Sequence, residues 1–157
     1  MINPKDNSYA YVGMKLPISS ANIENTGYML NEPVLYTANN VISIMTTGNS
    51  NLDGTTGTYY DNITGTSNGT LVKRIIIKAQ GNTSQGMVRM FFKAGGSVWL
   101  MREIEVPAIT QAAVTPTFIA IIDEPFYLKA SYLLRFSTEN SNTIIVTTEG
   151  VDTSYPY

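Results

Sequence analysis

Two acidic residues, Glu103 and Glu105, lie two positions apart in the segment SVWLMREIEV (97–106). Side chains two apart on a β-strand point to the same face, so the carboxyl groups lie roughly 7 Å apart, a separation at which paired carboxylates do acid–base chemistry. The same residues also fit a solvated strand end on which the acids face Arg89 and Lys93. Because no companion base accompanies the pair, we expect the solvated strand end and no catalysis.

The chain contains no histidine and no cysteine. The first absence removes the commonest general base and metal ligand, and the second removes thiolate nucleophiles, thiolate metal sites and disulfides. No phosphate-binding glycine loop, nucleophile elbow or dinucleotide fingerprint occurs. The adjacent acids Asp123 and Glu124 precede Pro125, which favours a turn. The sequence therefore predicts a protein that is not an enzyme and takes no cofactor.

The segment NSNLDG (49–54) resembles the opening of a calcium-binding loop. Oxygen donors stand at its first, third and fifth positions (Asn49, Asn51 and Asp53), and a glycine stands at its sixth. The twelfth position, however, is Tyr60, where such a loop has a bidentate glutamate. We therefore expect a turn rich in Asn and Gly, and no metal site.

The composition predicts an electrically quiet surface. Only 14% of the 157 residues are charged, and the formal net charge is −2; the usual charged share is about 25%. Such a chain lacks the dense basic stripe that neutralises phosphates, so we expect no nucleic-acid partner. The start MINPKDNSYA lacks the apolar core of a signal peptide, and no apolar run approaches the ~20 residues that cross a bilayer. We expect no membrane partner either.

Residues 1–33 are interrupted by prolines and show no helix or strand period, so we expect an extended N-terminal arm ahead of a domain over 34–157. VISIMTT (41–47) is rich in β-branched residues, which favours a strand. The next 22 residues, 48–69, hold five glycines and no lysine or arginine. They predict a long loop, and loops of this length are usually functional or mobile.

Six further segments are rich in strand-forming residues, and short polar or Gly-bearing links separate most of them. They are LVKRIIIKAQ (71–80), MVRMFFK (87–93), SVWLMREIEV (97–106), TFIAIIDEPFYL (117–128), SYLLRFST (131–138) and TIIVTTEG (143–150). No segment has convincing helical periodicity. The sequence predicts an all-β fold: a single antiparallel β-sandwich of seven to eight strands, of which a jelly roll is one form.

The segment MVRMFFKAGGSVWLMREIEVPA (87–108) predicts a β-hairpin closed by glycines. A two-residue Gly-Gly loop places Arg89 opposite Arg102, and like charges directly opposed are unfavourable. We therefore expect a three-residue loop, 94–96, which shifts the register by one residue.

This register divides the hairpin into a core face and an unusual outer face. Its core residues are Val88, Met90, Phe92, Val98, Leu100, Ile104 and Val106. Its outer face sets apolar side chains inside a charged border: Met87, Arg89, Phe91, Lys93, Trp99, Met101, Glu103 and Glu105. Because proteins rarely leave such a patch bare, either the protein's own 48–69 loop or arm covers it, or another chain does.

Two other features are candidates for contact with a partner or with the protein itself. Tyr59 and Tyr60 lie at the centre of the 48–69 loop, where they pin it or offer a contact. Ile119 and Ile121 alternate with equally apolar neighbours, so we expect their strand to be central in its sheet or covered on both faces.

Five ordered pieces between residues 69 and 152 resemble a known group of proteins. They are GTLVKRIIIKAQGN (69–82), VRMFF (88–92), LMREIEVPA (100–108), YLLRFST (132–138) and IIVTTEGVD (144–152). The chain resembles the small all-β virion proteins of tailed bacteriophages, particularly those encoded near capsid genes in phages of Bacteroidetes, including crAss-like phages. The shared features are a V-R-hydrophobic strand, a Gly-rich turn, an E-I-x-hydrophobic-P-A exit and a final Gly-x-Asp. The resemblance covers a little over half the chain and carries over no catalytic residues.

The resemblance implies an auxiliary capsid protein of the decoration or cement kind. Its implied partners are the major capsid protein or other virion proteins, with the chain a homo-oligomer or bound to the lattice. Its implied location is the capsid surface of the virion, after assembly in the host cytoplasm. The alternative is a head-fibre or tail component that binds carbohydrate, with Trp99, Tyr59 and Tyr60 stacking on sugars.

Overall fold

The computed structural model describes residues 36–153. The expected arm over 1–33, the expected domain start at residue 34 and the tail 155–157 lie outside the described residues. Within the described range every regular element is a β-strand, so the all-β prediction is confirmed.

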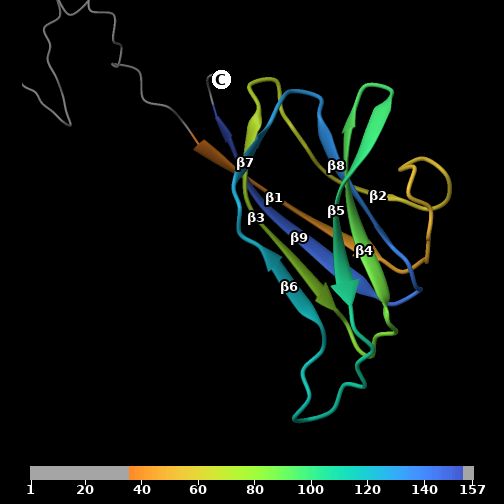
Figure 1. The fold of residues 1–157 in the computed structure, drawn as a ribbon. Helices are drawn as coiled ribbons and strands as arrows, with labels where there is room; N and C mark the ends of the chain where they lie inside the picture. Colours follow the sequence, from red (N-terminus) through yellow and green to blue (C-terminus); the bar gives the residue numbers. More distant parts are fainter. Residues whose placement is uncertain (1–35, 154–157) are drawn as a thin grey trace, which may run out of the picture. The chain divides into compact units, whose positions relative to one another are not determined.

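Nine strands make up the described part of the chain (Figure 1). Most follow the β-branched and aromatic segments of the sequence, as side chains that fit a pleated, half-buried surface should. They are β1 (Tyr36–Met45), β2 (Tyr60–Thr64), β3 (Thr70–Ala79), β4 (Gly86–Ala94), β5 (Ser97–Val106), β6 (Ile119–Ile122), β7 (Phe126–Leu128), β8 (Leu133–Thr138) and β9 (Ile144–Thr153).

The strands pair as a nested series of antiparallel neighbours. β1 pairs with β9, β2 with β8, β3 with both β6 and β7, and β4 with β5. Sheet A has the order β1-β9-β3-β6, with β7 also on β3, and sheet B has the order β2-β8-β4-β5. Nested pairs wound into two packed sheets make a jelly roll, so the sandwich prediction is confirmed in that form.

The structure has nine strands in residues 36–153, whereas seven to eight were predicted, and two local differences explain the larger number. β2 lies inside the predicted 48–69 loop, so the irregular segment runs only over residues 46–59. The predicted strand 117–128 is interrupted at residues 123–125 and becomes β6 and β7. Pro125 has no N–H to donate to a ladder, which is consistent with a break at this point.

The hydrophobic core lies between the two sheets, because side chains alternate along each strand and one set faces inward. On β3, for example, Ile75 and Ile77 are fully buried while Lys78 is exposed. Burial of each such side chain contributes about 1.5–3 kcal/mol relative to exposure. The core is built from both sheets and includes Met45, Ile63, Val72, Leu128, Leu134, Phe136, Ile144 and Val146.

The β4–β5 hairpin turns through two residues, Gly95 and Gly96, so the predicted three-residue loop is wrong. Gly95 has a φ of 59°, in the left-handed region that a tight hairpin turn requires and that glycine adopts without strain. As a result Phe92 pairs with Trp99, and Phe91 pairs with Leu100.

A β-bulge explains how the hairpin avoids the unfavourable charge pairing that argued against a two-residue turn. The register shifts between Met90 and Phe91, which leaves Met101 as the extra residue on β5. Beyond the bulge Arg89 lies opposite Glu103 instead of Arg102. The bulge therefore turns a like-charge pair into an ion pair.

Polar contacts join the two sheets along both sides of the sandwich. On one side, Ser43 Oγ on β1 donates to the Asp61 carbonyl on β2 at 3.1 Å, and Asn62 Nδ2 donates to Ser43 Oγ at 2.8 Å. On the other side, Arg102 Nη2 on β5 lies 2.7 Å from Glu124 Oε1, just after β6.

Candidate interaction surfaces

Phe91 lies on the outer face of sheet B and is fully buried. The Tyr59 ring packs edge-on against it, with 5.2 Å between ring centroids. A Cβ atom built on Gly54 would lie 3.2 Å from the Phe91 ring and closer still to Val98, so the loop backbone lies directly over this face. Of the two predicted alternatives, cover by the protein's own loop is therefore confirmed at Phe91.

Arg135 on β8 fastens the 46–59 loop to sheet B. Its Nε lies 2.6 Å from Asp61 Oδ1, and its Nη1 donates to the Gly54 carbonyl at 3.0 Å. Its guanidinium carbon also lies 5.6 Å from the centroid of the Tyr59 ring, within cation–π range. One partly buried cation on β8 thus contacts the loop at Gly54 and Tyr59 and the following strand, β2, at Asp61.

The residues that imitate a calcium loop form the loop's own hydrogen bonds. Asn49 is buried, its Nδ2 donates to the carbonyls of Thr56 and Thr58, and its Oδ1 accepts the N–H of Asn51. Asp53 accepts the hydroxyl and the N–H of Thr56, and these bonds hold its pKa well below the usual range. The expected turn is confirmed. Within residues 36–153 no group of three or more acidic side chains is placed to hold a metal ion.

Tyr60 fixes the start of this loop to the end of β1. Its hydroxyl oxygen accepts the N–H groups of Thr46 and Thr47, each at 3.0 Å. Burial raises the pKa of this hydroxyl, but the hydrogen bonds from Thr47 and Thr46 together outweigh burial and lower the pKa to about 8. The Tyr60 hydroxyl therefore joins the chain just after β1 to β2, the edge strand of sheet B.

Arg89 is nearly buried on the outer face and holds two acids. Its Nε lies 3.0 Å from Glu103 Oε1, and its Nη2 lies 3.1 Å from Glu139 Oε1. The expectation that the acids face Arg89 and Lys93 is thus confirmed for Glu103 with Arg89, whereas no ion pair within residues 36–153 joins Lys93 to either acid. Removing an acid from a buried cation is costly, so Glu103 is held in a structural role although its own side chain is 42% exposed. Glu105 is also exposed.

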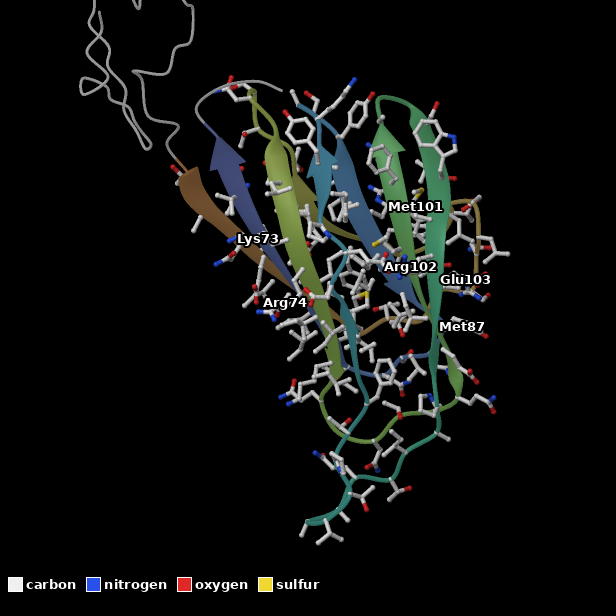
Figure 2. The ribbon with its side chains drawn as sticks, turned by 60° about the vertical axis from the view of Figure 1, so that its left-hand side comes forward. Lys73, Arg74, Met87, Met101, Arg102 and Glu103 are labelled. Carbon is white, nitrogen blue, oxygen red and sulfur yellow. The ribbon has the colours of Figure 1, made fainter. Side chains whose placement is uncertain are left out.

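Trp99 and Met101 do not share the outer face with Phe91. Trp99 lies 6.2 Å from Phe92, ring centroid to centroid, and is 49% exposed. Figure 2 shows Met101 on the side of β5 toward sheet A, and Glu103 on the opposite side. The prediction that Trp99 faces Phe91 is wrong, because it depended on the three-residue loop.

The aromatic residues proposed to stack on sugars are separated. Trp99 lies on β5 and Tyr60 on β2, which are the two opposite edges of sheet B. Tyr59 packs against Phe91 on the outer face, and its hydroxyl contacts Asp53 within the loop. The structure therefore does not bring the three rings onto one platform.

The outer face of sheet A carries an apolar surface that the sequence analysis did not assemble. Six isoleucines point outward from its four main strands: Ile42 and Ile44 on β1, Ile145 on β9, Ile76 on β3, and Ile119 and Ile121 on β6. The strand register places them in two rows across the sheet, Ile42–Thr147–Ile76–Ile121 and Ile44–Ile145–Lys78–Ile119. We call this surface the isoleucine face.

The isoleucine face is open to solvent in the described part of the chain. The four isoleucines on β1 and β6 are each more than half exposed, with Ile42 at 65%. A polar border lies beyond one row, where Arg74 Nη2 pairs with Glu149 Oε1 at 3.0 Å. Figure 2 shows Lys73 and Arg74 on the side of sheet A that faces away from sheet B. The expectation of a central strand at 119–122 is wrong, because β6 ends the strand order of sheet A, and cover on both faces is not provided by residues 36–153.

A cavity of about 330 Å³ opens between the sheets on the side where β5 and β6 approach each other. Its walls are mainly apolar and come from strands β4 to β8: Met90, Phe92, Met101, Ile122, Phe126 and Leu134. Arg102 and Glu124 line the cavity and form their ion pair there.

No known protein-family model matches the chain, and no curated protein matches it either. Among residues 36–153 there is also no helix with the length and apolar character needed to cross a membrane.

Proposed function

We propose that this protein is a structural virion protein, an auxiliary capsid protein of a tailed bacteriophage, and that it attaches to a capsid protein through the isoleucine face. The observation that carries the proposal is that face: six isoleucines in two adjacent rows on the outside of the five-stranded sheet A. Single exposed apolar residues need no explanation, but a contiguous rimmed patch is typical of protein–protein contact.

The chemistry of the face fits a protein partner. Six of the eight positions in the two rows are isoleucine, and charge lies at Lys78 within one row and at Lys73 and the Arg74–Glu149 pair beyond the other. Interface cores are depleted of charge and surrounded by polar rims, and the face follows this arrangement except at Lys78. β-Branched side chains also lose little conformational freedom on burial, so a rigid sheet of isoleucines binds at low entropic cost.

Two further observations support a virion protein, both by analogy. Double-sheet jelly rolls are found in viral capsid proteins as well as in lectin domains and cupins, so the fold is compatible with the role. The sequence resemblance to small all-β phage virion proteins covers strands β3, β4, β5, β8 and β9, which include the centre of both sheets.

A charge-substituted variant tests the proposal. Ile42→Lys with Ile121→Lys alters two outward positions, which surface substitution should tolerate within about 0.5 kcal/mol each. An isoleucine buried at an interface contributes about 1.5–3 kcal/mol, so losing two should weaken attachment about a hundredfold or more. We expect the variant to fold normally, as judged by circular dichroism and thermal unfolding. When it is added to capsids that lack the natural chain, we expect it not to sediment with them.

The matched control is Val114→Lys, which adds the same charge at a position that is 92% exposed and outside the isoleucine face. It should sediment with capsids as the natural chain does. Equal incorporation of the double variant would exclude the isoleucine face as the docking surface. A copy number per particle that matches a single vertex or the tail, and not the capsid lattice, would contradict the capsid assignment.

A further inference from the structure

The cavity between the sheets has the size and chemistry of a small-molecule site. Its volume of about 330 Å³ lies at the lower end of the roughly 300–1,000 Å³ usual for such sites. Met90, Ile122 and Leu134 line it and are themselves nearly buried, so the walls belong to the packed core and not to a mobile loop. A cavity of this kind favours a compact apolar body.

The polar groups of the cavity are concentrated in one ion pair. Arg102 is 2.7 Å from Glu124 through a single Nη2–Oε1 contact. In the structure over residues 36–153, the remaining guanidinium N–H groups and Glu124 Oε2 have no other protein partner. The cavity therefore presents donors and an acceptor side by side, with no net charge between them.

We propose that this cavity binds a small, mainly apolar molecule that carries one uncharged hydroxyl or amide head group. The apolar body fills the space between Phe92, Ile122 and Leu134. The head group accepts a hydrogen bond from Arg102 and donates one to Glu124. An anionic head would be repelled by Glu124 and a cationic head by Arg102, so a neutral head suits the pair best. The proposal is independent of capsid attachment, because the cavity and the isoleucine face use different surfaces.

The sole tryptophan of the chain provides a direct measure of binding. Trp99 lies 6.2 Å from Phe92, which lines the cavity, and so its fluorescence should respond when the cavity is filled. We expect octanol to change Trp99 emission saturably, and to do so at lower concentration than octanoate or octylammonium. A linear response to all three probes, or tighter binding of either charged probe, would overturn the proposal.

Substitutions on neighbouring residues of one strand separate filling of the cavity from general effects. Ile122→Phe places a larger side chain in the cavity and should abolish the octanol response, whereas Ile121→Phe, which faces outward, should leave it intact. An equal response in the two variants would contradict binding in the cavity.

The assignment of the head group is tested at Arg102 and Glu124, whose side chains are exposed. Variants at these two positions should fold even if Ile122→Phe does not. Arg102→Gln and Glu124→Gln each break the ion pair but keep a hydrogen-bonding amide. Each should weaken octanol binding about three- to tenfold, because a bond to a charged group is replaced by one to a neutral group. Unchanged affinity in both variants would remove the head-group assignment.

Discussion

Replacing Phe91 with alanine measures how firmly the 46–59 loop belongs to the folded core. Phe91 is fully buried and contacts Tyr59 and the backbone at Gly54. Truncation of a buried phenylalanine to alanine costs about 3–5 kcal/mol, out of a total stability of about 5–15 kcal/mol for a typical domain. Trp99→Ala should cost less, about 1–2 kcal/mol, because half of that side chain is already exposed.

Urea unfolding followed by far-ultraviolet circular dichroism gives the comparison. With a slope of about 2 kcal/mol per M, the Phe91→Ala midpoint should fall by about 2 M and the Trp99→Ala midpoint by less than about 1 M. Val114→Ala serves as a surface control and should not move the midpoint.

The decisive result is the position of the Phe91→Ala midpoint. A midpoint indistinguishable from that of the natural chain would mean that the loop does not cover Phe91 in solution. If that stable variant also failed to join particles, Phe91 would be an interface residue and the loop contact would be secondary.

Three further predictions concern the loop and its supports. The pKa of Asp53 is lowered in the folded protein, so the ionised carboxylate stabilises the fold fully above the unfolded pKa of about 3.9, and this stabilisation is lost as pH falls toward the folded pKa. In Asp53→Asn, the urea midpoint should no longer show this dependence on acid pH. The pKa of Tyr60 is lowered to about 8, so stability should rise as pH passes from there to the ordinary value of about 10. An ultraviolet titration should show one tyrosine ionising near the lower value and none there in Tyr60→Phe. Arg135→Leu should speed proteolytic cleavage within 46–59, whereas Arg74→Leu, which removes a surface ion pair on sheet A, should not.

The strands were predictable because their side chains carry the signal locally. Segments such as LVKRIIIKAQ and TIIVTTEG are rich in β-branched residues and bounded by turns, and both are strands in the structure. The nested pairing was not predictable in the same way, because it depends on contacts between strands far apart in the chain. β2 was missed since YDNIT, with only Ile63 buried, is a short polar edge strand inside a Gly-rich segment.

Features of the surface could be predicted from the sequence only where residues close together in the chain determine them. The charges indicated that the acids of β5 face Arg89, but the two-residue turn decided which aromatic residue faces Trp99. The bulge at Met101, which has no local sequence marker, decided that Arg89 lies opposite Glu103. The isoleucine face could have been suspected from the apolar runs III (75–77) and FIAII (118–122), in which the residues between the buried ones are also apolar. Its assembly required the register of β1, β9, β3 and β6, which no single segment contains.

The place of β9 ties the completion of the fold to the end of its synthesis. β9 lies between β1 and β3, so Ile44 meets its neighbour Ile145 only after about a hundred more residues have been made. At about 5–20 residues per second, β1 waits about 5–20 seconds on the ribosome with an unpaired edge. A chain released before Ile144 would leave β1 and β3 without the strand that joins them. Since the isoleucine face spans β1, β9, β3 and β6, unfinished chains would not present an intact face to a growing particle.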